Sequence, residues 1–294
     1  MYLLTFRDET GLRLGVRTER GVLDVDAARR RLGVRNVPQS ITEILEGGER
    51  ALRSLQAFVE RVLESGEVEW VDEAGLTLAP AVPQPGKLIC VGLNYLDHCR
   101  ETGMEPPKAP VLFAKWNNAL AASGETITLP AASSQVDYEA ELAVIIGRRC
   151  KGVSPEAALD YVAGYTIMND VSARDFQFSD GQWVRAKSQD GFAPLGPYFV
   201  TKDEVPDVQD LPIRLLLNGQ VMQDSSTAEM IFPVREIVSY ISQGITLEPG
   251  DVIATGTPFG VGMSRKPPVW LQDGDEVAIE IGRLGRLVNR FRRA

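Results

Sequence analysis

Three acidic residues lie in the most strand-like part of the sequence. Glu139 and Glu141 are two residues apart at the head of an apolar run that ends at Ile146, and Asp170 follows a second apolar segment, 163–168. Because side chains on a strand alternate between its faces, both glutamates point the same way, with Cα atoms roughly 6.6 to 6.8 Å apart. Their carboxylates can therefore reach a single ion.

The surroundings of these acids favour a buried metal site. The uninterrupted apolar run 142–146 indicates a strand covered on both faces, which would bury the two glutamates. Buried like charges either take up protons or are matched by a positive charge, and a divalent cation is the simplest match. The alternative places both glutamates on the solvated face of an edge strand. The second acidic strand end, Asp170, favours the metal.

The chain has a single histidine, His98. A multi-histidine transition-metal site is therefore excluded, and oxygen ligands predict a hard ion, Mg²⁺ first, with Mn²⁺ or Ca²⁺ as substitutes. If the residues around His98 form a helical turn, Glu101 lies three positions on and on the same face. A carboxylate there would orient the ring and raise its basicity, as a general base near neutral pH requires. The alternative is a surface histidine beside a glutamate.

Two further segments could contribute to an anion site. Alternation predicts a strand over 184–190, with Arg185 and Lys187 on one face. Two neighbouring cations usually face solvent, but beside an acidic metal site they could bind a substrate carboxylate or an oxyanion. A strand at 252–255 runs into the turn 255–258, whose backbone and hydroxyl groups could donate to an anion.

The elements that must position these residues are mostly strands. We predict an α+β fold that is mainly β, with a small α+β N-terminal domain over 1–80 and a catalytic domain over 81–294, divided at the proline-rich stretch 78–86. The first domain contains short strands within 2–26 and a helix over 41–63 that is interrupted at Gly47 and Gly48. The second lacks the regular strand–helix alternation of a doubly wound sheet. Its expected strands are 87–91, 140–146, 163–168, 213–217, 252–255 and 276–281, and its expected helices are 155–161 and 234–243.

Composition excludes several classes of function. The chain has 294 residues and a net charge of −9, which argues against general binding to nucleic acids or anionic membranes. Its three cysteines show no Cys-x-x-Cys spacing, so no disulfide framework or zinc site is indicated. There is no signal-like N-terminus or apolar run of membrane-spanning length, and we expect a soluble, cytoplasmic protein. Motifs for nucleotide phosphates, serine hydrolases and zinc proteases are absent.

Five segments, in this order and spacing, resemble the fumarylacetoacetate hydrolase family: 91–95 with His98 and Glu101, 137–142, 169–175, 187–188, and 255–258. The resemblance covers roughly residues 85–290, and the first 80 residues resemble the small N-terminal domain of many bacterial members. It implies a mixed β-sandwich roll, a homodimer and a metal at the centre of the roll. Long members have an aspartate ligand ahead of the histidine, whereas this chain has Asn94 and Tyr95 there. A three-carboxylate site, as in short members, is implied.

The resemblance also implies a role for each site residue. The metal ligands would be Glu139, Glu141 and Asp170. His98 and Glu101 would form a catalytic dyad on a mobile lid, with Lys187 as the active-site lysine. The substrate-binding residues would be Gln177, Thr257, Arg174 and Tyr95.

The substrate that this resemblance implies is a small 2-oxo acid. We expect metal-dependent hydrolysis of a C–C bond in a 2,4-dioxo acid, giving pyruvate and a carboxylic acid, with His98 activating water and Lys187 stabilising negative charge. Decarboxylation of oxaloacetate, and isomerisation of a 2-hydroxydienoate or another 2-oxo acid, pass through a similar enolate and stay open. The segment 264–271 also resembles members that act on sugar-derived diketo acids. A remote alternative is a non-catalytic 2-oxo acid binding protein.

Overall fold

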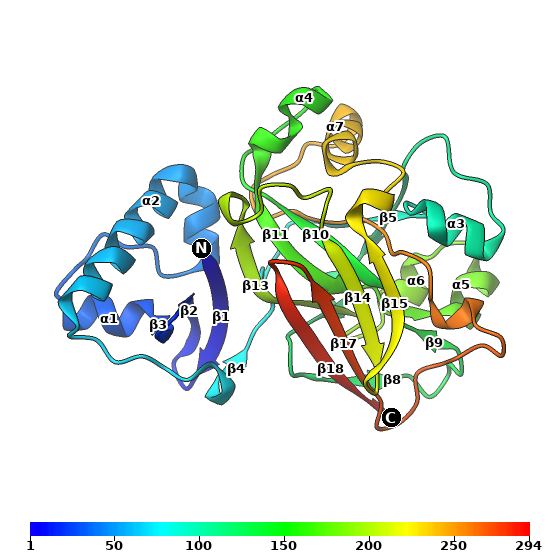
Figure 1. Ribbon diagram of the computed structural model, residues 1–294, viewed down its shortest axis with the longest axis horizontal. Coiled ribbons are helices and arrows are strands. Elements are labelled where there is room, and N and C mark those ends of the chain that lie inside the picture. The colour runs from blue at the N-terminus through cyan, green and yellow to red at the C-terminus, as the bar shows by residue number, and fades with distance from the viewer.

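The computed structural model describes all 294 residues, and its main feature is a sheet of eleven strands. The path of this sheet runs β3-β2-β1-β13-β11-β10-β16-β5-β6, with β4 and β7 pairing beside it. Figure 1 shows the N-terminal module at one side of a larger, strand-rich body. Outside this module, the large sheet contains the strands β5 (Leu88–Gly92), β6 (Val111–Lys115), β7 (Leu120–Ala121), β10 (Ala140–Ile146), β11 (Val162–Asn169), β13 (Ala193–Thr201) and β16 (Val252–Ala254).

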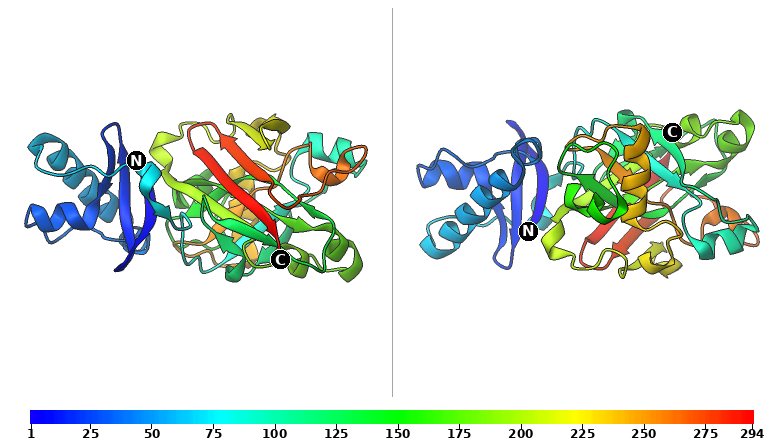
Figure 2. Two further views of the ribbon diagram at one scale, coloured as in Figure 1. Left: turned by 90° about the horizontal axis from the view of Figure 1, so that it is seen from below. Right: turned by 90° about the horizontal axis from the view of Figure 1, so that it is seen from above.

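The N-terminal module continues this sheet. Its first strand pairs antiparallel with β13, with Tyr2 opposite Val200 and Leu3 opposite Phe199. The module forms one end of an elongated molecule (Figure 2). The sheet therefore crosses from the N-terminal module into the larger body. The elements of the module are β1 (Tyr2–Asp8), β2 (Gly11–Thr18), β3 (Gly21–Asp24), α1 (Val25–Arg31), α2 (Ile41–Ser65) and β4 (Thr77–Leu78).

The helix predicted over 41–63 is confirmed as α2. Ser40 caps it, because its hydroxyl accepts a hydrogen bond from Glu43 N at 3.1 Å. The interruption expected at the double glycine is also present, since Gly48 has φ 57° and ψ −145°, which is not helical. Glycine adopts this left-handed φ without the steric cost that a Cβ would bring.

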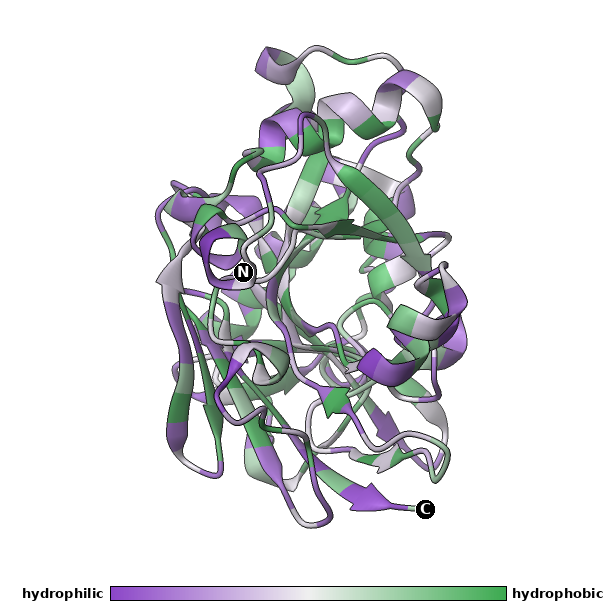
Figure 3. Ribbon diagram, turned by 90° about the vertical axis from the view of Figure 1, so that its right-hand side faces the viewer, coloured by the Kyte–Doolittle hydropathy of each residue, from purple (hydrophilic) through white to green (hydrophobic).

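A second sheet of five strands packs in the larger body, in the order β15-β14-β17-β18-β8. Viewed from the side of α3 and α5, strands near the middle of the body are largely hydrophobic (Figure 3). These sheets and seven α-helices make the fold mixed α+β with more strand than helix, as predicted. The remaining elements are β8 (Thr126–Leu129), β9 (Val136–Asp137), β12 (Ser172–Ala173), β14 (Pro212–Leu217), β15 (Gln220–Ser226), β17 (Glu276–Ile281), β18 (Gly285–Arg293), α3 (Leu96–Thr102), α4 (Pro155–Ala158), α5 (Arg174–Asp180), α6 (Val184–Lys187) and α7 (Val234–Gly244).

Strand β10 is the strand predicted to be covered on both faces, and all seven of its residues are buried. It lies between β11 and β16 in the large sheet. None of the helices is long and apolar enough to span a membrane. The three cysteines are buried and unpaired, in agreement with the absence of a disulfide framework.

The strand predicted over 184–190 is wrong. Residues Val184–Lys187 form the short helix α6, and residues two apart on a helix do not share a face. Arg185 therefore points to solvent, where it pairs with Asp180, while Lys187 turns into the protein and is 2 % exposed. The two cations do not form one binding surface.

Candidate active site

Strand register brings the three predicted metal ligands together. Strands β10 and β11 are antiparallel with Ala140 opposite Asn169, so Glu139 and Asp170 occupy neighbouring strand ends. The Asp170 amide donates a hydrogen bond to the carbonyl of Glu139 at 2.9 Å. One carboxylate oxygen from each of Glu139, Glu141 and Asp170 lies within 4.8 Å of the others, and all three residues are buried.

Two buried lysines bind the carboxylate of Asp170, one at each oxygen. Lys187, at the end of α6, donates to Asp170 Oδ2 at 2.8 Å and to Glu139 Oε2 at 2.7 Å. Lys115, at the end of β6, donates to Asp170 Oδ1 and to the carbonyl of Val171. An ammonium group has three donors, so Lys187 retains one N–H beyond these two bonds.

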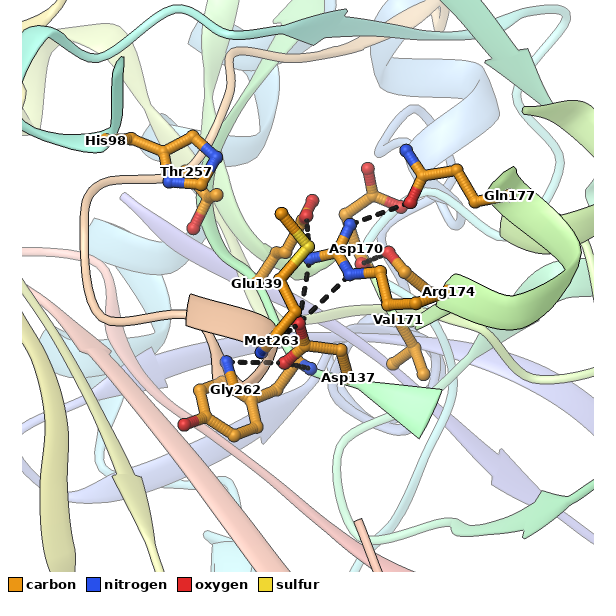
Figure 4. A network of polar contacts seen from close by, with 12 residues as sticks. His98, Asp137, Glu139, Asp170, Val171, Arg174, Gln177, Thr257, Gly262 and Met263 are labelled. Carbon is orange, nitrogen blue, oxygen red and sulfur yellow. Dashed lines mark hydrogen bonds and ion pairs between the residues drawn. The ribbon is translucent and has the colours of Figure 1, made fainter. Parts of the chain in front are cut away.

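Arg174 organises the other side of the site. Its guanidinium donates to Asp137 Oδ2 at 3.0 Å, to Glu139 Oε1 at 2.6 Å and to Gln177 Oε1 at 2.9 Å. Asp137 in turn accepts from the backbone amides of Gly262 and Met263. Figure 4 shows Arg174 at the centre of this network, with His98 and Thr257 standing apart from it. The network fixes the Gln177 amide so that its NH₂ group points away from Arg174.

The two glutamates differ in charge environment. Burial by itself would raise the pKa of Glu139, but Lys187 and Arg174 outweigh it and lower that pKa to about 2. Burial, and then the charges of Asp170 and Glu139, raise the pKa of Glu141 well above its ordinary value. Glu141 has no cationic partner and accepts only the backbone amide of Gly256, at 2.8 Å.

This charge distribution fits a divalent cation. Four carboxylates face the three cations Lys115, Arg174 and Lys187, and the unmatched carboxylate is that of Glu141. The triad offers only oxygen donors, which hard divalent ions prefer. The carboxylates of Glu139, Glu141 and Asp170 could hold a metal ion, and the charge of this ion would compensate that of Glu141.

Gly256 places a backbone donor at the acidic triad. It has φ +97°, and a Cβ there would lie 2.8 Å from Asn94 Cβ and 3.1 Å from the carbonyl of Val91. Only glycine therefore fits between the turn at 255–258 and the segment that precedes α3. The turn at 255–258 was expected to donate to an anion, and its Gly256 N–H donates to the carboxylate of Glu141.

The predicted dyad lies on α3. His98 Nδ1 is 3.3 Å from Glu101 Oε2, as expected for residues three apart on a helix. The second oxygen of Glu101 accepts from Gly260 N at 2.9 Å, which anchors the carboxylate to the neighbouring loop. With Nδ1 facing Glu101, Nε2 is the ring nitrogen that remains for a substrate.

A cavity of about 110 Å³ joins these groups. Of the ten predicted site residues, seven line it: His98, Glu139, Glu141, Arg174, Gln177, Lys187 and Thr257. Glu101 supports the ring of His98, and Asp170 is bound to Lys187 behind the lining. The structure thus places nine of the ten at or directly behind one cavity.

Tyr95 is the exception, because the structure places it outside the cavity lining, and its role in substrate binding stays a prediction. It is the residue before α3, its side chain is 0 % exposed, and it packs in the hydrophobic core rather than lining the cavity. Its hydroxyl has no hydrogen-bond partner, and burial raises the pKa of the phenol well above its usual value. The residue at the start of α3 is turned inward, whereas His98, three positions later, faces the cavity.

Sequence reasoning missed two charged residues of the site. Lys115 ends an apolar strand, a position where a lone charge signals a special environment, but nothing in the sequence links it to Asp170, 55 residues away. Asp137 precedes Glu139 by two residues, so the alternation that pairs the two glutamates also applies to it. Its guanidinium partner, Arg174, is visible only in the tertiary structure.

The raised pKa of Glu141 predicts that metal binding depends on pH. At a pH above 4.5, the ordinary pKa of a glutamate, Glu141 of the metal-free folded protein keeps a proton that the same residue has lost in the unfolded chain. A cation that binds must displace this proton. We expect the increase in melting temperature caused by Mg²⁺ to grow as pH rises from 5 to 8. In Glu141→Gln, which carries no such proton, the stabilisation should be smaller and nearly independent of pH. An equal increase at every pH in the unmodified protein would contradict this.

Known proteins match the chain over its whole length. A family model described as fumarylacetoacetate (FAA) hydrolase C-terminal matches residues 87–292. Oxaloacetate tautomerase FAHD2A, mitochondrial, of Bos taurus is 44 % identical over 272 residues, which cover 92 % of this chain and 83 % of the relative.

Solved structures agree with this match. Fumarylacetoacetate hydrolase from Exiguobacterium antarcticum is 36 % identical and superimposes with a TM-score of 0.81, each chain being covered completely. Maleylpyruvate hydrolase from a Sphingobium species is 30 % identical with a TM-score of 0.80, again with complete coverage of both chains. The protein is an enzyme with an acidic triad of the kind that holds a divalent metal. It belongs to the fumarylacetoacetate hydrolase family.

Proposed function

We propose that this enzyme interconverts the enol and keto forms of a small 2-oxo acid, with oxaloacetate as the leading substrate. The observation that carries the proposal is the small cavity that holds a general base and an acidic triad together. Its volume of about 110 Å³ is well below the roughly 300 to 1,000 Å³ of pockets for drug-sized ligands, which favours a four-carbon substrate. The name of the Bos taurus relative, 44 % identical, supports this choice.

The metal has one task in this proposal. A divalent cation held by Glu139, Glu141 and Asp170 would supply a Lewis acid that stabilises negative charge on the 2-oxo oxygen. The remaining N–H of Lys187 adds a donor on the same side of the cavity, because its other two N–H groups are held by Glu139 and Asp170. The substrate carboxylate would meet the free donors of Gln177 and Thr257.

His98 moves the proton. Its Nδ1–H donates to Glu101, which leaves the lone pair of Nε2 facing the cavity as the base. In the keto form, Nε2 takes the proton from C3 while the double bond shifts and charge develops on the 2-oxo oxygen. The imidazolium then gives this proton to the 2-oxo oxygen, which yields the enol and restores neutral His98, and the reverse steps restore the ketone. Glu101 stabilises the imidazolium that forms between them.

Hydrolysis of an acylpyruvate is the second candidate, and a specific feature favours it. The outer wall of the cavity is apolar, formed by Met104, Phe178, Trp183 and Met263. Both cations that line the cavity, Arg174 and Lys187, already pair with carboxylates, so none is free for the second carboxylate of a dicarboxylic acid. His98 would then activate water, and the name of the Sphingobium neighbour is consistent with such a reaction.

One substrate panel separates these reactions. Purified protein with Mg²⁺, and with a chelator as control, is given enol-oxaloacetate, oxaloacetate and acetylpyruvate. Enol absorbance that decays faster with Mg²⁺ than with chelator, without release of CO₂, is the expected result. Cleavage of acetylpyruvate to pyruvate and acetate would instead establish the hydrolase. Release of CO₂ and pyruvate from oxaloacetate would establish a decarboxylase, and either outcome without enol decay would remove the tautomerase.

A further inference from the structure

Gln223 connects the two halves of the candidate site without lining its cavity. It lies on β15, in the five-stranded sheet, whereas the metal ligands lie on the large sheet. Its side chain is 0 % exposed, and its hydrogen-bond partners are uncharged. Such a buried amide must place each of its donors and acceptors on a partner.

The hydrogen bonds of Gln223 determine which way its amide faces. Oε1 accepts from Ala140 N at 2.9 Å, and this backbone amide can only donate. Nε2 must therefore be the end that faces Thr257 Oγ1, at 2.8 Å, and the carbonyl of Pro258, at 2.9 Å. The carbonyl can only accept, which requires the same orientation. Two independent partners thus fix one rotamer of the amide.

This orientation in turn sets the direction of the Thr257 hydroxyl. Because Thr257 Oγ1 accepts from Gln223, its own hydrogen is available to donate, and Thr257 Oγ1 donates no hydrogen bond to the protein. Thr257 lines the cavity. A hydroxyl held this way presents a donor, rather than a lone pair, to the molecule in the cavity.

We propose that Gln223 is a positioning residue that keeps the hydroxyl of Thr257 as a donor to the carboxylate of the bound 2-oxo acid. The inference rests on the proposed function only in taking an anionic 2-oxo acid as the ligand. Gln223 selects anions at this position, because without its N–H on Oγ1 the hydroxyl could turn a lone pair, rather than its hydrogen, toward the cavity. A hydrogen bond to a charged group is worth enough to change affinity by on the order of tenfold or more.

Oxalate is the probe for this proposal, because its two adjacent carboxylates imitate the 2-oxo acid and its enolate but undergo no reaction. Binding is measured by calorimetry for Mg²⁺ alone and for oxalate in saturating Mg²⁺, in the unmodified protein and in Gln223→Met, Thr257→Val and the double variant. We expect each single variant to weaken oxalate binding on the order of tenfold with Mg²⁺ affinity retained. The double variant should be no weaker than Thr257→Val, since both remove the same donor.

Three results would overturn the proposal. These are unchanged oxalate binding in Gln223→Met, losses that multiply in the double variant, and a loss of Mg²⁺ affinity as large as that of oxalate. The last would show that Gln223 only supports Ala140 and the strand that carries the metal ligands. Failure of oxalate to bind the unmodified protein would instead contradict the proposed function, so the two failures are distinguishable.

A second comparison covers the case in which Gln223→Met does not fold. Thr257→Ser keeps the hydroxyl and Thr257→Val keeps the shape. A donor held by Gln223 predicts that Thr257→Ser retains oxalate affinity and Thr257→Val loses it by on the order of tenfold. Equal affinity in these two variants would overturn the proposal.

Discussion

Replacing His98 by glutamine is expected to lower the turnover number by about 10² to 10⁴-fold, the usual contribution of a general base. Glutamine has nearly the length of histidine but cannot accept a proton near neutral pH. His98 makes no contact with the triad through a hydrogen bond, and its ring bonds only to Glu101. Mg²⁺ affinity and melting temperature should therefore stay close to those of the unmodified protein, as calorimetry and thermal unfolding would check.

Glu101→Gln is the matched control for this prediction. It keeps the acceptor for Gly260 N but removes the negative charge that stabilises the imidazolium. We expect a smaller loss of turnover than in His98→Gln. Full activity in His98→Gln with either oxaloacetate or acetylpyruvate would remove the histidine from both candidate mechanisms.

Replacing Lys187 by methionine is expected to reduce the free energy of unfolding of the metal-free protein by about 3–5 kcal/mol. Lys187 is buried and pairs with Glu139 and Asp170, so its removal leaves two buried carboxylates short of positive charge. The corresponding fall in melting temperature is roughly 6 to 20 °C. Saturating Mg²⁺ should restore part of this loss, because the cation supplies positive charge to the same two carboxylates.

Arg185→Met provides the control two residues away. Arg185 pairs with Asp180 at the surface, where solvent screens the interaction, so we expect little change in stability with or without Mg²⁺. Equal destabilisation by both substitutions would mean that α6 itself, rather than the charge of Lys187, is responsible. A drop in stability of Lys187→Met that Mg²⁺ does not diminish would argue against a metal at the triad.

Local pattern was sufficient to predict the elements that carry the metal ligands and the dyad. The apolar run after Glu141 indicated a doubly covered strand, and β10 is buried throughout. The spacing of His98 and Glu101 indicated one helical face, and their ring nitrogen and carboxylate lie 3.3 Å apart. The double glycine predicted the break in α2 at Gly48. Each of these features depends on neighbours within a few residues, which is the range over which side-chain periodicity acts.

Pattern failed where a short segment is compatible with more than one kind of element or where no period exists. The alternation of Arg185 and Lys187 was taken as a strand with both side chains on one face, but these residues lie on a helix of four residues, which places the two side chains on different sides. The direction of Tyr95 depends on how the chain enters α3, and its extended backbone at the N-cap leaves the side chain buried in the core. The catalytic and substrate-binding roles of the cavity residues remain predictions that the variants above test.

The sequence by itself determined the acidic triad, the pair of His98 and Glu101 and the class of fold, because the residue types and their short-range periods require no distant contact to be recognised. Only the tertiary structure decided how the charges are matched. Lys115 reaches Asp170 across 55 residues, and Gln223 reaches Ala140 across 83 residues from the other sheet. A buried charge or amide needs a partner in space, and only packing the two sheets against each other selects which residue supplies it.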